Sequence, residues 1–377
     1  MSGPVVVICI DGLDPEYLES CEVPNLDEMG SKGFKNIGRC LMPSVTNVNN
    51  VSIVTGTYPV HHGIASNFHF VRGTGEGIYM ESVEYIRAET LFQRTKSVGK
   101  NSLLVTSKDK LRTLLGDGAT MAISSERPPD WIAKEVGPPP PIYSLEVNGW
   151  SIDAARVAMI RNQFDVVYVS TTDFAMHMYG PDEPESQEHL TIMDDAIGRL
   201  LEEHWEATVF VTADHGMSRK ERMIDLGQAL ENVGMRGEAV PIIKDRYIRH
   251  HSNLGGCINV YLESGSASDA VEVLSEVDGV EKALIRDQAA ALWMLPEDRI
   301  GDIFVTGEAD VVFGNPEEVE LPLGLRSHAS EHELRIPIIG YNGEFDVLSF
   351  QENRDIGRYL FQTVFDSDLA STFNDNG

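Results

Sequence analysis

Six side chains of the types that bind metal ions are spread over almost the whole sequence. They are Asp11, Asp173, His177, Asp214, His215 and His328. Three carboxylates and three imidazoles suit two zinc-type ions, each held by mixed oxygen and nitrogen donors with one position open for chemistry. A hydroxyl nucleophile is also available, because Thr46 follows Pro43 where an apolar strand breaks and a predicted helix begins. The sequence therefore contains the parts of a two-metal site.

A sheet flanked by helices would bring these distant residues together. Short apolar runs alternate with helical patterns, which is typical of an α/β fold. The predicted strands cover residues 4–10, 101–106, 165–170 and 207–213, and the predicted helices cover 151–163 and 185–204. Asp11, Asp173 and Asp214 fall just past the C-terminal ends of such strands, where open α/β sheets bind their ligands. We expect the three segments to converge on one edge of the sheet.

One region has a different pattern and predicts a second, smaller unit. Residues 234–325 contain CINVYLES, ASDAVEVLSEV and VEKALIRD, which indicate strand, helix and strand, and end in GDIFVTGEADVVFG. This block lies between Asp214 and His328. We therefore predict a catalytic core formed by residues 1–233 and 326–377, with an α+β insertion that sits over the metal site as a cap.

Composition limits the function classes. The formal charge of −29 over 377 residues makes nucleic acid an improbable partner, because phosphate backbones are bound through surplus Lys and Arg. An anionic substrate would need local cations, such as metal ions or lysines. The four cysteines lack CxxC pairing, no basic leader precedes the first strand, and no apolar run reaches about 20 residues. We expect a cytoplasmic protein with reduced thiols and no membrane contact.

Each motif also has an ordinary structural explanation. An Asp after a strand, such as Asp11, is common as a helix cap, and the four-residue spacing of Asp173 and His177 occurs often by chance. The adjacent Asp214 and His215 are more informative, because neighbours that cannot share a helix face can both turn toward an ion from a loop. Only the complete ordered set favours a metal-dependent enzyme.

The same segments carry a family resemblance. In order, IDGLDPEYL, PSVTNVNNVSIVTGTYPVHHGIASN, TTDFAMH, TADHGM and RSH resemble the alkaline phosphatase superfamily, in its branch of nucleotide pyrophosphatases, phosphodiesterases and phosphonoacetate hydrolase. The resemblance spans nearly the whole chain and implies an alkaline-phosphatase-like core. Within the branch, VTSKDKLRTLLG, LPEDRIGDIFV and LRSH are most similar to segments of phosphonoacetate hydrolase. This resemblance implies hydrolysis of the carbon–phosphorus bond of phosphonoacetate to acetate and phosphate.

The resemblance also implies roles for single residues. Two zinc ions are implied, one held by Asp173, His177 and His328 and the other by Asp11, Asp214, His215 and the Thr46 oxygen. Thr46 would attack phosphorus and form a phospho-threonine intermediate, which an activated water then hydrolyses. Asn67 would donate to a phosphoryl oxygen in the transition state, although it could instead only form a turn.

A pair of lysines would explain how carbon can leave phosphorus. The resemblance assigns Lys108 and Lys110 to the substrate carboxylate, which accepts charge as an enolate. Lysines two apart point the same way in an extended segment but diverge on a regular helix, so KDK must be non-helical or at a helix start. The alternative is a solvated turn that caps a helix beginning near Leu111.

The remaining histidines have weaker assignments. His62 belongs to a His-Gly pair and is expected to shape the surroundings of the site. His250 and His251, at the start of the predicted cap, could reach the substrate, but we expect them on the surface. No motif includes His69, His189, His204 and His332, and those on helices are predicted to be solvated.

Other functions stay open. The same site suits a phosphodiesterase or nucleotide pyrophosphatase, which would need an aromatic slot in place of a lysine pair. A phosphomutase would bind two manganese-type ions with further ligands that the sequence lacks, and a non-catalytic phosphonate-binding module would not need the complete set. Zinc rather than manganese or iron rests on the resemblance, since mixed Asp and His donors accept all three. The resemblance also allows a homodimer.

Overall fold

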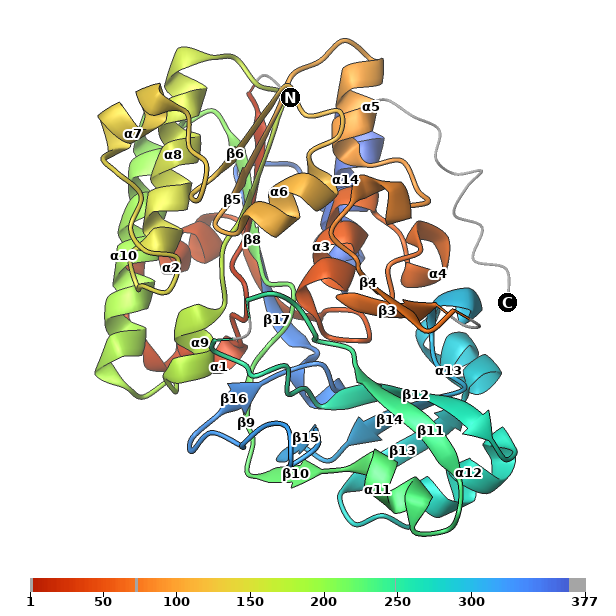
Figure 1. The fold of residues 1–377 in the computed structure, drawn as a ribbon. Helices are drawn as coiled ribbons and strands as arrows, with labels where there is room; N and C mark the ends of the chain where they lie inside the picture. The colour runs from red at the N-terminus through yellow and green to blue at the C-terminus, as the bar shows by residue number, and fades with distance from the viewer. Residues whose placement is uncertain (1–2, 72–73, 248, 366–377) are drawn as a thin grey trace.

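The centre of the fold is a mixed seven-stranded sheet, found within residues 3–71, 74–247 and 249–365, which the computed structural model describes. The strand order is β2-β17-β8-β1-β7-β5-β6 (Figure 1). The strands in that order are Phe34–Arg39, Arg335–Tyr341, Thr208–Thr212, Val5–Cys9, Val166–Ser170, Ser102–Thr106 and Met121–Ser124. From β8 to β6 neighbouring strands are parallel, whereas β17 is antiparallel to β8 and β2. The predicted α/β class is confirmed.

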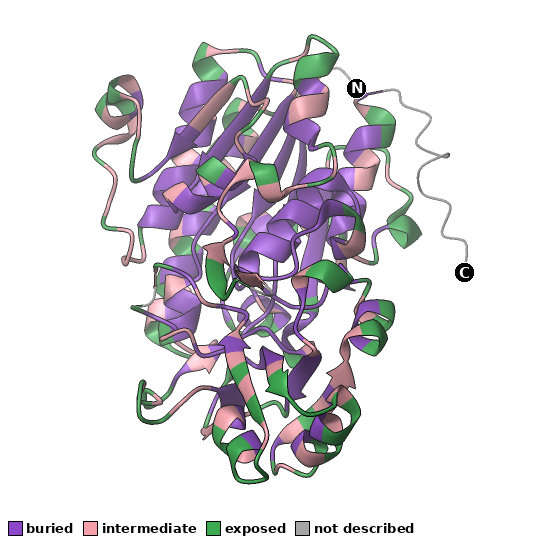
Figure 2. Ribbon diagram, turned by 45° about the vertical axis from the view of Figure 1, so that its right-hand side comes forward, coloured by how far each residue is buried: buried purple, intermediate pink, exposed green. Residues whose placement is uncertain are grey.

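Helices cover both faces of this sheet (Figure 1). One face carries α2 (Pro24–Lys32), α7 (Asp130–Val136), α8 (Val147–Arg161) and α10 (Pro184–Glu203), and the other carries α3 (Thr46–Thr55), α5 (Leu91–Ser97) and α14 (Arg354–Thr363). Because both faces are covered, β1, β5, β7 and β8 are buried along their whole length (Figure 2). Strands of this kind are continuous apolar runs in the sequence, which made them easy to predict.

The predicted elements of the core are present with small shifts at their ends. All four predicted strands lie within one residue of β1, β5, β7 and β8 at each end. The predicted helix at 185–204 is α10, while the one at 151–163 begins earlier, at Val147. No side chain caps the start of α8, so the sequence gives no signal there.

A second, antiparallel sheet lies at one end of the core (Figure 1), in the order β11-β12-β14-β13. Its strands are Arg236–Pro241, Cys257–Ser264, Ile303–Gly307 and Val280–Ile285, and it packs with α11 (Leu226–Glu231) and α12 (Ala267–Ser275) around an apolar cluster of its own. The predicted order of strand, helix and strand at residues 257–287 is found. The last segment turns into a helix, α13 (Arg286–Trp293), where a strand was expected to continue. The domain boundaries at 234 and 325 stay predictions, since α11 packs with this sheet from before residue 234.

Three short strand pairs complete the description. They are β3 with β4 (Phe68–Val71 and Glu76–Tyr79), β9 with β16 (Ser218–Arg219 and Arg326–Ser327), and β10 with β15 (Arg222–Ile224 and Val311–Phe313). The pair β9 and β16 lies where the chain passes between the core and the smaller sheet (Figure 1). This pair therefore connects the two units.

Helix α3 is polar in sequence and yet buried along its whole length. Its hydroxyl side chains bond carbonyl groups one turn back, as Ser52 does to Val48 (2.7 Å) and Thr55 to Val51 (2.7 Å). Internal hydrogen bonds of this kind remove the cost of burying polar groups. The helix starts at Thr46, as predicted, and carries that residue into the interior.

Two further expectations concern the state of the cysteines and the presence of a membrane-spanning helix. All four cysteines are buried and free, and Cys9 packs in the main core as expected. Among the residues that the structure describes, no helix has the length and apolar character needed to cross a bilayer.

Candidate metal centre and active site

Four neighbouring strands end beside one another at the candidate site. In sheet order β8, β1, β7 and β5, the residues two or three positions past each strand are Asp214, Asp11, Asp173 and Lys108. Parallel strands align their carboxyl ends, so loops that are far apart in sequence meet at this edge. The convergence expected for the three aspartates is present.

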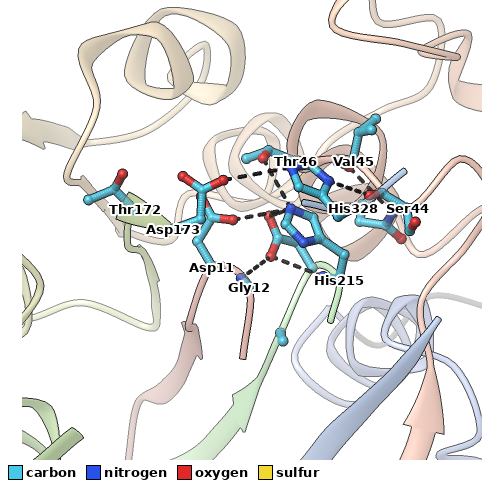
Figure 3. A network of polar contacts seen from close by, with 12 residues as sticks. Asp11, Gly12, Ser44, Val45, Thr46, Thr172, Asp173, His215 and His328 are labelled. Carbon is cyan, nitrogen blue, oxygen red and sulfur yellow. Dashed lines mark hydrogen bonds and ion pairs between the residues drawn. The ribbon is translucent and has the colours of Figure 1, made fainter. Parts of the chain in front are cut away.

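The first cluster contains Asp11, Asp214 and His215, with Thr46 beside them. Figure 3 shows Asp11, His215 and Thr46 side by side. The Nε2 atom of His215 lies 3.3 Å from Oδ1 of Asp11, 3.7 Å from Oδ2 of Asp214 and 3.4 Å from Oγ1 of Thr46. Asp214 is held by its other oxygen, Oδ1, which accepts from the backbone N–H groups of Gly12 (3.2 Å) and His215 (3.0 Å). Gly12 has φ +76°, and a Cβ there would meet Met217 and Met176, so glycine is required at this turn.

The second cluster is centred on Asp173. Its Oδ2 lies 2.9 Å from Nε2 of His177 and 3.7 Å from Nε2 of His328. Its Oδ1 contacts Lys108 and His250, which are described below. The ring of His328 stacks on that of His215, with centroids 3.6 Å apart and planes within 7°. All six predicted metal-type ligands are therefore gathered in two adjoining clusters.

The three histidines share one tautomer. A carbonyl oxygen accepts from Nδ1 in each case: Arg326 for His177 (2.5 Å), Gly216 for His215 (2.9 Å) and Ser44 for His328 (2.7 Å). Since a carbonyl can only accept, Nδ1 carries a proton in each ring, and Nε2 is the nitrogen that faces the aspartates. Metal-binding histidines are commonly fixed in this way, with the second nitrogen held by the backbone.

Asp11 supplies a direct test of whether a cation fits. Its side chain is 1% exposed, and neither carboxylate oxygen has a hydrogen-bond partner among the described residues. A buried carboxylate that accepts no hydrogen bond is costly, so such groups are paired, as Oδ1 is with His215 at 3.3 Å, or bind metals. Asp11 forms a buried triple with Asp214 and His215, whose ligand atoms lie within 4.8 Å of one another, and two further triples of this kind contain Asp173. The residues present fit a pair of metal ions.

The charges of the metal-free clusters conflict strongly. Burial, and then the Asp11 charge, raise the pKa of Asp214 well above its usual range. Burial lowers the pKa of His215, but the charges of Asp214 and Asp11 outweigh it and raise the value to about 9. Burial and the neighbouring imidazoles His215 and His177 hold the pKa of His328 well below normal. Positive charge placed between these groups would relieve the conflict.

Thr46 stands at the first position of α3, with unused backbone donors around it. Val45 makes no side-chain cap, so it satisfies none of the first-turn N–H groups of α3. The N–H of Asn47 donates to Oδ1 of Asn67 (3.3 Å), which holds that amide beside Thr46. Among the described residues, the NH₂ group of Asn67 has no protein acceptor. Asn67 thus lies at the site and is more than a turn residue.

Both predicted lysines are buried beside the Asp173 cluster. Lys108 is the N-cap of α6 (Asp109–Leu115), and Lys110 is the second helical residue, so KDK lies at a helix start as the assignment required. Lys108 Nζ donates to Oδ1 of Asp173 at 2.8 Å, and Lys110 pairs with Asp245. Their side chains are 2% and 3% exposed, which contradicts the alternative of a solvated turn.

The expectation that His250 and His251 lie on the surface is wrong. They are 4% and 2% exposed, and His250 Nε2 lies 3.2 Å from Oδ1 of Asp173. Both belong to the β11–β12 connection, whose described residues 242–247 and 249–256 fold back over the sheet edge. In the described structure Nδ1 of His250 has no hydrogen-bond partner, unlike Nδ1 of the three histidines above. We therefore place the proton of His250 on Nε2, which donates it to Asp173. His251 Nε2 lies 3.4 Å from Asp245.

Sequence reasoning missed several residues that hold the site. Asn50 donates to Asp214 (3.2 Å) and accepts from Tyr168 (2.9 Å), and the hydroxyl of Thr171 accepts from the N–H of Asp11 (2.8 Å). Asp245 and Tyr247 lie in the β11–β12 connection. The TNVNN run that starts α3 was a usable signal for Asn50, because adjacent amides at a buried helix start need partners.

Two further histidines are buried outside the clusters. His62, which lies between Thr46 and Asn67 in the sequence, accepts from the N–H of Ile64 (3.1 Å) and contacts Ser52 of α3 (2.9 Å). It therefore fixes the turn that leads to Asn67. His189 on α10 is 1% exposed, and the prediction that it is solvated is wrong. It bonds Leu145 and Asn148 on the neighbouring α8 side, a tertiary contact that helical periodicity does not show.

His62 should make the protein less stable in acid. Burial lowers its pKa from 6.5 to about 3, so the unfolded chain takes up the proton first as pH falls through 6.5. The free energy of unfolding should drop by about 2 kcal/mol between pH 7 and pH 5 from this residue alone. Urea unfolding at both pH values should show a difference smaller by that amount in His62→Gln. His61→Gln, at the exposed neighbouring position, is the control and should match wild type. Equal pH dependence in the two variants would contradict the assignment.

Comparisons with known proteins agree with this geometry. The profile of the family described as type I phosphodiesterase / nucleotide pyrophosphatase matches residues 5–332. Curated relatives include ectonucleotide pyrophosphatase/phosphodiesterase family member 3 of Rattus norvegicus (26% identical over 65% of this chain and 29% of the relative) and a venom phosphodiesterase of Naja atra (24% over 65% and 30%). The chain spans less than a third of the length of these relatives.

Solved structures give a fuller match. Phosphonoacetate hydrolase from Sinorhizobium meliloti 1021, in complexes with phosphonoformate and with phosphonoacetate, is 31% identical over 96% of this chain and 95% of that one, with a TM-score of 0.87. Murine ectonucleotide pyrophosphatase/phosphodiesterase 5 shares the fold at 16% identity, with a TM-score of 0.70. The resemblance noted in the sequence is confirmed. The chain belongs to the type I phosphodiesterase / nucleotide pyrophosphatase family, a group of metal-dependent hydrolases with the alkaline phosphatase fold.

Proposed function

We propose that this protein is a di-zinc phosphonoacetate hydrolase that cleaves the carbon–phosphorus bond to give acetate and phosphate. The observation that carries the proposal is the buried lysine pair beside the Asp173 cluster, in a chain that resembles a phosphonoacetate hydrolase over 96% of its length. A phosphonate with one carboxylate needs cations at both ends. The two groups of candidate metal ligands and the lysine pair would place these cations in adjoining positions.

Two zinc ions are proposed, one held by Asp173, His177 and His328 and the other by Asp11, Asp214, His215 and Thr46. Bound zinc would lower the pKa of a hydroxyl or water and offset the charge of the phosphonate. The Nδ1–H group common to all three histidines and the lack of hydrogen bonds to the Asp11 oxygens among the described residues support this ligand set.

In the first half of the reaction Thr46 acts as the nucleophile. Its Oγ1 forms a bond to phosphorus, its proton leaves to solvent, and the carbon–phosphorus bond breaks with its electron pair on carbon. Asn67 and the first N–H groups of α3 donate to the phosphoryl oxygens as charge builds on them. The product is a phospho-threonine, which water then hydrolyses at phosphorus, restoring the Thr46 hydroxyl and releasing phosphate.

The lysines solve the leaving-group problem. The carbanion formed at carbon is stabilised only if its charge spreads into the carboxylate as an enolate, and Lys108 and Lys110 would hold that carboxylate. Lys108 keeps one N–H on Asp173 and has two more to donate. The enolate takes a proton from solvent on carbon and leaves as acetate.

Phosphate release from phosphonoacetate and from a nitrophenyl phosphodiester tests the proposal. We expect the zinc-loaded protein to prefer phosphonoacetate, and Lys110→Ala to slow that substrate about 10- to 150-fold, the value of a charge-assisted hydrogen bond, while leaving diester turnover unchanged. Lys100→Ala, a partly exposed lysine paired with Asp165 at the other end of β5, is the control. If wild type prefers the diester, and Lys110→Ala changes neither rate, the protein is a phosphodiesterase. This is the alternative that the family match keeps open.

Metal content provides a separate prediction. Asp11 belongs to one cluster only, so Asp11→Asn should bind about one zinc per chain where wild type binds about two. Metal-bound wild type should also gain thermal stability over the chelated protein, because the ions bind only the folded state. Elemental analysis after dialysis and a thermal melt with and without chelator measure both. Asp165→Asn at the opposite sheet edge should retain two ions, and a wild type with one ion would contradict the assignment.

A further inference from the structure

The β11–β12 connection brings an aromatic ring against the lysine pair. The ring centroid of Tyr247 lies 5.7 Å from Nζ of Lys108 and 5.7 Å from Nζ of Lys110, within the range of cation–π attraction. The Tyr247 hydroxyl donates to Glu126 at 2.8 Å, on the loop after β6. One ring therefore contacts both ammonium groups and is fixed at its far end.

The neighbouring residue Asp245 fixes this arrangement from the same connection. It is 4% exposed, accepts from the N–H of Tyr247 (2.6 Å) and pairs with Lys110. Lys110 and the backbone of Tyr247 are thus held by a single carboxylate. These contacts hold the ring in a fixed position relative to the lysines.

A cavity begins where the ring ends. Its volume is about 480 Å³, and its lining includes Lys110 and Tyr247 together with the exposed Arg127 and Arg246. Lys110 itself is almost completely buried, so its contact with this cavity runs beside the tyrosine ring. Removing the ring would widen the opening of this cavity toward Lys110, and the space is large enough for several more carbon atoms.

We propose that Tyr247 is a specificity-determining residue whose ring closes the lysine subsite, so that only phosphonates with the carboxylate within one carbon of phosphorus fit. The inference rests on the proposed function, which places the substrate carboxylate at the lysines. Lys108 lies 2.8 Å from Asp173, so a carboxylate bound by the lysines is necessarily close to the proposed metal ligands. A longer chain would have to occupy the volume of the ring.

Calorimetric binding to the zinc-loaded protein tests this with phosphonoformate, 3-phosphonopropionate and 4-phosphonobutyrate. Wild type should bind phosphonoformate about 10- to 100-fold more tightly than the longer acids, as expected where extra methylenes must displace packed atoms. In Tyr247→Ala and Tyr247→Val this ratio should fall by about tenfold. Tyr247→Phe keeps the ring and loses only the bond to Glu126, and should keep the wild-type ratio.

The result separates this inference from the proposed function. Equal ratios in wild type, Tyr247→Ala and Tyr247→Val would overturn the role of Tyr247, as would a wild type that binds all three acids equally. If wild type discriminates by length and the truncations lose that discrimination, the role of the ring is supported even where phosphonoacetate releases no phosphate. In that case only the proposed reaction fails.

Discussion

Replacing Thr46 by alanine is expected to lower kcat for phosphonoacetate by about 10⁴-fold or more, the order seen when a covalent nucleophile is removed. The change should act on chemistry and not on folding. Among the residues that the structure describes, Thr46 Oγ1 has one long contact, 3.4 Å to His215, so its removal breaks no short hydrogen bond. The thermal midpoint should therefore stay close to that of wild type.

The same helix offers a matched control. Thr55→Ala removes a buried threonine hydroxyl that bonds the Val51 carbonyl at the other end of α3, and it should keep full activity. Thr46→Ser should retain measurable turnover because the hydroxyl is preserved. Acid-quenched protein should carry phosphate on residue 46 in wild type and none in Thr46→Ala. Residual activity in Thr46→Ala above about a hundredth of wild type would exclude Thr46 as the nucleophile.

Replacing Lys220 by methionine should destabilise the protein by about 3–5 kcal/mol, because it leaves a buried carboxylate uncompensated. Lys220 and Glu333 are paired at 2.8 Å with side chains 0% exposed. Lys220 also donates to the Ala309 carbonyl (2.8 Å), and Glu333 accepts from Ser330 (2.7 Å), two residues after His328. The pair therefore ties the β14–β15 loop to the segment that follows one proposed metal ligand.

Urea unfolding at pH 7 measures the effect. Lys282→Met breaks the partly exposed pair with Glu331, two residues from Glu333, and should cost less than about 1 kcal/mol. Burial raises the pKa of Glu333, but Lys220 and its hydrogen bonds outweigh it and hold the pKa below 4.5. The stabilisation by the pair is therefore present above pH 4.5 and is lost as pH falls below that value. A cost for Lys220→Met equal to that of Lys282→Met would contradict this account.

The core was predictable because its signals are local. β1, β5, β7 and β8 are continuous apolar runs, and each ends two or three residues before Lys108 or an aspartate of the site. The position of a side chain just past a parallel strand follows from the strand itself. For Asp11, Asp173 and Asp214, strand prediction alone was enough to expect a common edge.

The covering side of the site could not be predicted in the same way. His250 and His251 follow no periodic pattern, and positive φ angles at Ser252 and Asn253 turn the chain back over the sheet edge. Neither residue is glycine, so the sequence lacks the strongest local signal for left-handed backbone at this turn. His189 was misjudged for a related reason, since its burial depends on α8 packing against α10. In each case, partners distant in the chain decide the environment of the side chain.

The central place of β1 in the sheet has a consequence during protein synthesis. Its two neighbours, β7 and β8, begin at Val166 and Thr208, so an N-terminal strand of VVVIC has no partner until roughly 160 more residues are translated. At about 5–20 residues per second a ribosome needs about 8–30 seconds for that length. Throughout this interval both edges of an apolar strand are exposed to other chains. Efficient production of this protein should therefore depend on chaperones that shield its first strand while the ribosome completes the rest.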